Sequence, residues 1–194
     1  MKTSKNKLLK TIGIPLLILG VLLFGISRQQ LPVDTTQSAI IKANREDIWE
    51  IATDFEGAFE NSNPAHRGTE ILSEPKQPFW DSLRFYQKEK VGGITAELDG
   101  TVYDVNESRS FRWKAKTIYY FLGMEIPVDE GGTFRIEETT DKGYRVSHRI
   151  YGNFKDTFGG RTLSWLMESC FGMLQSASEH TLVELEYFKE QLEG

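Results

Sequence analysis

The chain has 194 residues, 23 of them basic and 28 acidic, a length that fits one domain with an appendage. Five of the basic residues and none of the acidic ones lie in residues 1–28, so the rest of the chain carries a formal charge near −10. Such an acidic body argues against nucleic acid as a partner, because binding to phosphates needs a positive surface.

The first 28 residues differ in character from the rest of the chain. No charge lies between Lys10 and Arg28, and residues 12–26 are almost wholly apolar. A basic start followed by an apolar stretch is typical of a signal peptide or a signal anchor. The small residues at the end of the apolar stretch form only a weak signal-peptidase cleavage site. We therefore expect a retained transmembrane helix, with a cleaved signal as the alternative. The preceding lysines favour a single-pass membrane protein with a cytoplasmic N-terminus and an extracytoplasmic domain.

A polar segment at residues 29–37 is expected to link this anchor to a folded domain at residues 38–194. The domain should open with a strand over residues 38–43. Asn44 then provides an N-cap for a helix that Gly57 breaks or bends.

The middle of the domain alternates between apolar and polar residues with the period of a β-strand. Because one face of each segment is polar, the pattern predicts an antiparallel sheet that is wet on one side. The strands are expected around residues 68–72, 80–89, 94–102, 111–115, 134–136 and 144–150.

Near the C-terminus, apolar or small side chains recur every three or four residues, which is the period of an α-helix. The pattern predicts one uninterrupted helix of about eight turns. Cys170 lies on this stripe and is expected to be a buried structural thiol. The stripe consists of Leu163, Leu166, Cys170, Leu174, Ala177, Thr181, Leu185, Phe188 and Leu192.

Three segments resemble the START-like, or Bet v 1-like, superfamily, also called the polyketide cyclase/dehydrase and lipid transport (SRPBCC) family. Residues 43–55 look like its first strand leading into its first helix, residues 61–66 like its loop back to the sheet, and residues 159–191 like its long C-terminal helix. The resemblance implies an α+β helix-grip fold, a curved antiparallel sheet wrapped around the C-terminal helix, here preceded by the transmembrane helix. It also implies a cavity for lipids, sterols or aromatic polyketides between sheet and helix.

Residues on the expected inner faces are the candidates to bind such a ligand. Trp113 and Phe134 alternate with charged neighbours and should meet Leu166 and Cys170 of the helix across the cavity. His148 shares a strand face with apolar residues, so it is either a hydrogen-bonded core histidine or an acid–base group. The predicted ligand-binding residues are Phe85, Trp113, Phe134, Tyr144, His148, Leu166 and Cys170.

Motifs of common catalytic, cofactor and metal sites are absent from the sequence. The three histidines are far apart and lack metal-ligand spacing, so neither a metal nor a cofactor is expected. Besides His148, His66 is expected in a loop and His180, which lies off the apolar stripe, on the surface.

The apolar stretch at residues 117–128 contains a glycine and a proline and lies between two alternating segments. It can extend both strands of a hairpin, form a lid over the cavity, or rest on the bilayer.

Together these features predict a membrane-tethered domain that binds a hydrophobic small molecule or lipid. One alternative is a polyketide cyclase-type enzyme with His148 as the acid or base. Another is a pocketless domain that binds proteins at the membrane surface.

Overall fold

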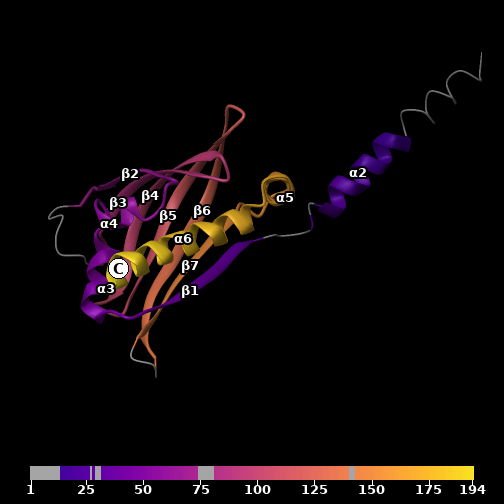
Figure 1. Cartoon of the computed structure of the whole chain (residues 1–194). Coiled ribbons are helices and arrows are strands. Elements are labelled where there is room, and N and C mark those ends of the chain that lie inside the picture. The colour runs from indigo at the N-terminus through magenta and orange to yellow at the C-terminus, as the bar shows by residue number, and fades with distance from the viewer. Residues whose placement is uncertain (1–13, 27, 29–31, 74–80, 140–142) are drawn as a thin grey trace, which may run out of the picture.

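A single antiparallel sheet forms most of the molecule in this computed structural model (Figure 1), which describes residues 14–26, 28, 32–73, 81–139 and 143–194. The strand order across the sheet is β1-β7-β6-β5-β4-β3-β2. Strands β2 to β7 thus lie side by side in chain order, and β1 pairs with β7 at the edge. The strands are β1 Val33–Ile41, β2 His66–Ile71, β3 Arg84–Val91, β4 Ile94–Asn106, β5 Ser110–Phe121, β6 Met124–Glu138 and β7 Tyr144–Phe154.

One face of the curved sheet is covered by helices. The last helix, α6, runs across the hollow of the sheet, and the two short helices α3 and α4 close one end (Figure 1). The α+β class and the wrapping of the sheet around the C-terminal helix are therefore confirmed. The helices are α2 Ile14–Ile26, α3 Arg45–Thr53, α4 Ala58–Asn61, α5 Phe158–Phe171 and α6 Met173–Glu193.

The inward face of each strand from β3 to β7 is the one that its alternating pattern predicted. On β3 and β4, every second residue from Phe85 to Val91 and from Ile94 to Val102 is buried. The same holds for Phe111, Phe134 and Val146 on β5 to β7. Because a slip of one residue would turn each of these side chains to solvent, burial of the apolar face fixes the register.

Strand β1 begins earlier than expected, at Val33 rather than at residue 38. It pairs with β7 along its own whole length, from Val33 opposite Gly152 to Ile41 opposite Tyr144. Residues 33–37 thus belong to the edge of the sheet and not to a linker, because their backbone groups complete the ladder with β7.

The apolar stretch at residues 117–128 extends two strands of a hairpin. Phe121 pairs with Met124 across a turn at Leu122 and Gly123, both of which have positive φ. A two-residue turn of that kind matches the twist of the flanking strands. Of the three alternatives for this stretch, the extended hairpin is confirmed.

The predicted long helix is divided at Gly172. This residue adopts the left-handed conformation, with φ 56° and ψ 48°, and its N–H bonds to the carbonyl of Glu168 to end α5. Glycine adopts this conformation without the penalty that a Cβ imposes.

The break rotates the buried face, so the stripe expected in the N-terminal half is wrong. Ser164 and Met167 are buried on α5, whereas Leu166 is half-buried and Cys170 is an exposed free thiol. In the C-terminal half the stripe is confirmed at Ala177, Thr181, Leu185 and Phe188.

The expected membrane anchor is contradicted. Among the described residues no helix is both long and apolar enough to cross a membrane. Residues 1–13 of the predicted anchor lie outside the described residues.

Two glycines of the sheet make room for aromatic rings. A Cβ at Gly100 would lie 2.2 Å from the ring of its partner Phe85, and one at Gly132 would lie 2.5 Å from Nε1 of its partner Trp113. Each ring therefore leans over the glycine opposite it.

Gly132→Ala should lower the free energy of unfolding by about 1–3 kcal/mol, since the new methyl group would displace Trp113 and also meet the carbonyl of Arg149 at 2.5 Å. Urea unfolding measures the change. Gly159→Ala is the matched control, because no atom lies within 4 Å of that position on α5 and alanine favours a helix. An equal loss in both variants would contradict the explanation.

Candidate functional site

A cavity opens between α6 and the sheet, with an empty volume of about 920 Å³ that includes its part open to solvent. It separates two apolar clusters, one around Phe55 and Phe188 and the other around Leu98 and Met167. Its wall is mainly aromatic and aliphatic, and the apolar or glycine lining residues are Val33, Phe55, Phe59, Phe85, Val91, Leu98, Phe111, Trp113, Val128, Ile150, Gly152, Phe154, Met173 and Ala177.

Polar side chains gather where α6 faces the strands. They come both from strands of the sheet and from α6. Three of them are glutamates, and none is a lysine or an arginine. The polar lining residues are Gln87 and Glu89 of β3, Tyr119 of β5, Glu130 of β6, His148 and Tyr151 of β7, and His180 and Glu184 of α6.

Glu184 lies at the centre of this group and is 1 % exposed. Its Oε2 accepts a hydrogen bond from Nδ1 of His148, at 2.7 Å. Its Oε1 lies 2.9 Å from Nε2 of His180, one helical turn before it on the same face. The partner that a buried imidazole on β7 requires is therefore a carboxylate on α6.

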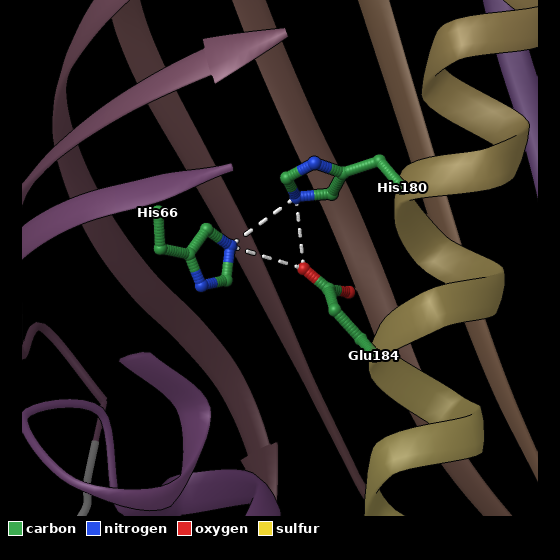
Figure 2. Close-up of side chains that lie close together, drawn as sticks. All are labelled: His66, His180 and Glu184. Atoms are coloured by element: carbon green, nitrogen blue, oxygen red, sulfur yellow. Dashed lines mark hydrogen bonds and ion pairs between the residues drawn. The ribbon is translucent and has the colours of Figure 1, made fainter. Parts of the chain in front are cut away.

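His66, which the sequence placed in a loop, is instead the first residue of β2 and is buried. Its Nε2 lies 3.3 Å from Oε1 of Glu184 and 3.3 Å from Nε2 of His180. Asn63 ties the preceding loop to α6, because its side-chain amide donates to the carbonyl of His180 at 3.0 Å. Figure 2 shows His66, His180 and Glu184 pointing toward one another.

The charges of this cluster are set by burial and by each other. Burial alone would lower the pKa of His180, but the Glu184 carboxylate and, further away, Glu89 raise it to about 9. Burial would raise the pKa of Glu184, but His180 and His148 hold it well below its ordinary value. At neutral pH the pair is therefore an imidazolium beside a carboxylate.

Glu130 has a different environment on the opposite wall. Burial and the nearby Glu89 raise its pKa to about 7, although Thr117, Tyr119 and the more distant His180 act against the shift. The hydroxyls of Thr117 and Tyr119 donate to its two oxygens, each at 2.6 Å. A carboxyl group with a pKa near 7 can both give and accept a proton at neutral pH.

Glu130 should make the protein less stable as the pH rises. Because its pKa is higher in the folded chain than the ordinary 4.5, the stability that it contributes is complete below pH 4.5 and is lost as the pH rises to about 7. Glu130→Gln should reduce this fall in the free energy of unfolding by about 1–3 kcal/mol. Urea unfolding at pH 5 and pH 8 measures it.

The control for this variant is Glu125→Gln, an exposed position on the same strand. It should keep the wild-type difference between the two pH values. A Glu130→Gln variant whose stability changes with pH as steeply as the wild type would show that Glu130 is ionised throughout the range.

The structure brings together part of the predicted ligand-binding set. Phe85, Trp113 and His148 line the cavity, and Phe134 is buried with its ring centroid 6.2 Å from that of His148. Four of the predicted residues are not among the lining residues: Phe134 is buried beside His148, Tyr144 packs against the core, Leu166 is half-buried and Cys170 is exposed.

His180 was expected on the surface, but its side chain is only 10 % exposed and lines the cavity. The sheet curves around α6, so the buried arc of that helix is wider than its apolar stripe. Met173, His180 and Glu184 lie beside the stripe, and together with its members Ala177 and Phe188 they form a row with helical spacing. The His180–Glu184 pair at i, i+4 on that row was the signal in the sequence that could have revealed the cluster.

Comparisons with known proteins support the fold and leave the activity open. No family model and no curated protein matches the sequence. Among solved structures, the aromatase/cyclase Zhui from Streptomyces sp. R1128 superposes with a TM-score of 0.63 at 13 % identity, over 84 % of this chain and 94 % of that one. A conserved protein from Geobacillus kaustophilus gives 0.60 at 10 % identity, over 82 % and 95 % of the two chains.

A third structure is the di-domain aromatase/cyclase StfQ of the steffimycin biosynthetic pathway. It superposes with a TM-score of 0.57 at 12 % identity, over 84 % of this chain and 51 % of that chain. At these identities the likeness shows the fold alone, which is the helix-grip fold of START/Bet v 1-like proteins.

Proposed function

We propose that the domain binds an apolar, aromatic small molecule in the cavity, with a polar oxygen of the ligand turned toward the histidines and glutamates of its wall. The observation that carries this proposal is the combination of an aromatic lining with a few convergent polar groups, the usual composition of a small-molecule site. Burial of the ligand's apolar surface would supply affinity at roughly 25 cal/mol per Å². The polar groups would fix its orientation.

Calorimetric titration with 2-naphthol and 2-methoxynaphthalene tests this proposal. The two probes share a ring system, but only 2-naphthol can donate a hydrogen bond to a cavity carboxylate. We expect both to bind in a saturable manner and 2-naphthol to bind more tightly, since an unpaired buried acceptor is costly. Absence of saturable binding of both probes would contradict the proposal.

A second function is favoured by the place of Glu130, a cavity carboxyl group that accepts hydrogen bonds from Thr117 and Tyr119 and whose pKa burial raises to about 7. With Tyr119 beside it, Glu130 can remove a proton from a carbon next to a ligand carbonyl and return one, the kind of step that cyclisation of a polyketone requires. His148 is the other candidate acid or base on this wall. Two of the superposed structures are named as aromatase/cyclases, which supports a cyclase-type reaction.

Proton exchange distinguishes catalysis from binding. In D₂O, the protein should accelerate the exchange of the C1 protons of 2-tetralone, followed by NMR, and Glu130→Gln should remove the acceleration. Glu125→Gln, outside the cavity, should retain it. Equal exchange with and without protein would leave binding as the function.

A further inference from the structure

His66, His180 and Glu184 occupy the positions of three ligands around one ion. The three side-chain atoms His66 Nε2, His180 Nε2 and Glu184 Oε1 are separated by 3.3, 3.3 and 2.9 Å. Ligand atoms that are 2.0–2.1 Å from a shared zinc ion lie about 3.3 Å apart in a tetrahedral site and about 2.9 Å apart at right angles. The three atoms point at a common centre (Figure 2).

Hydrogen bonds alone do not account for this arrangement. Glu184 Oε1 is buried, and its contact with the His180 imidazolium is an ion pair at 2.9 Å that lacks hydrogen-bond geometry; a metal ion bound here would take the place of the proton on His180 Nε2. Nδ1 of His66 faces the carbonyl oxygens of Phe59 and Glu60 at 3.1 and 3.2 Å, so it must carry the ring proton. Nε2 is the ring nitrogen that faces Glu184 Oε1, at 3.3 Å, and a cation between these two atoms would bind both.

The surroundings orient two of the three ligands, His66 and Glu184, as outer-shell groups do in metal sites. The carbonyls at Nδ1 fix the tautomer of His66, and His148 holds the other oxygen of Glu184 at 2.7 Å. Such contacts raise the affinity of a site and select its geometry.

A β-bulge turns His66 into the site. His66 and Ile71 are both buried, although they are five residues apart and a regular strand would place them on opposite faces. The register between β2 and β3 shifts between His66 and Gly68, and Gly68 has a φ of 152°. A bulge of this kind re-aims a side chain and is frequent beside functional sites.

The charge of the cavity also suits a cation. Glu89, Glu130 and Glu184 line it without a lysine or arginine, and Oε2 of Glu89 lies 3.7 Å from Nε2 of His180. A divalent ion would offset this excess of carboxylates, since buried charges need partners.

We infer that His66, His180 and Glu184 bind a divalent transition-metal ion of the zinc class. Two imidazoles and one carboxylate favour such an ion over Mg²⁺ or Ca²⁺, which take oxygen ligands. His180 and Glu184 also line the cavity, so a fourth position on the ion would face its interior, the open arrangement of catalytic rather than structural zinc sites. The inference does not depend on which organic ligand the cavity takes.

Zinc titration of the full chain, prepared without a histidine tag and treated with a chelator, tests the inference. Competition with the chromophore 4-(2-pyridylazo)resorcinol gives the affinity, and elemental analysis after dialysis gives the stoichiometry. We expect one zinc per chain and no retained magnesium. His66→Gln, His180→Gln and Glu184→Gln should each weaken binding by more than about 10-fold, because loss of an outer-shell partner alone costs roughly 10–100-fold.

The matched controls are Glu125→Gln, which removes an exposed glutamate outside the cavity, and Cys170→Ser, which removes the exposed thiol. Both should bind zinc as the wild type does. Zinc should raise the Tm of both controls but not of the His66, His180 and Glu184 variants. If the His66, His180 and Glu184 variants fail to fold, binding of one zinc by both the wild type and Cys170→Ser still supports the site. The chain has three histidines and all of them contact Glu184, so any histidine that binds the zinc belongs to this cluster. The inference would be overturned if the wild type bound no zinc, or if the His66, His180 and Glu184 variants bound zinc as tightly as the controls.

Discussion

Glu184→Ala should lower the free energy of unfolding by about 3–5 kcal/mol at neutral pH, the usual cost of removing one partner of a buried ion pair. Three imidazoles surround this carboxylate within 3.3 Å, and it is 1 % exposed. Its removal would leave the positive charge of His180 with only the longer contact to Glu89, at 3.7 Å, and would leave an unpaired donor on His148. The void left by the side chain would add to the loss.

Urea unfolding of chelator-treated protein, followed by circular dichroism, measures this change. Treatment with the chelator keeps the result independent of any bound metal. Glu138→Ala is the control: its carboxylate pairs with Arg45 at 3.6 Å but its side chain is 75 % exposed, so the expected loss is below about 1 kcal/mol. Similar losses in the two variants would mean that the Glu184 cluster does not hold the domain together.

Ala177→Phe should abolish binding of 2-naphthol while leaving the domain folded. Ala177 is buried on α6 and lines the cavity, so a phenyl ring at this position would occupy the space that the ligand needs. Because the ring would enter existing empty space, the change in the free energy of unfolding should be small, within about 1–3 kcal/mol. Calorimetry and urea unfolding of the same preparation separate the two effects.

A matched control is Leu182→Phe, which adds a ring at an exposed position of the same helix. It should bind 2-naphthol as tightly as the wild type. Undiminished binding by Ala177→Phe would place the bound molecule elsewhere on the protein.

Most of the fold could be predicted because burial imposes a period on the sequence. The alternation of apolar and polar residues that places Phe134 and Val146 inward can be seen within each short segment of sequence. In the folded sheet the same side chains are the buried ones. The break in the long helix could not be read from periodicity, since Gly172 stands between two segments whose apolar residues happen to continue one stripe. Its conformation depends on how α5 and α6 each meet the sheet.

The site was harder to predict than the fold because it is assembled from distant residues. His66 and Glu184 are separated by more than 100 positions in the sequence, and they meet because a bulge redirects one and the curve of the sheet buries the other. The aromatic lining was partly predictable, because Phe85 and Trp113 lie on inward faces of strands. The expected membrane anchor is contradicted, since no helix in the described part of the chain is long and apolar enough to cross a membrane.

Native mass spectrometry of the gently purified full chain tests the central claim, that the cavity holds a small organic molecule, most directly. The wild type should carry an additional mass that organic solvent extracts, and Ala177→Phe, purified in the same way, should not. If the wild type carries none and takes up no 2-naphthol when the probe is added, or if both proteins carry the same adduct, the cavity is not the binding site and the account is contradicted.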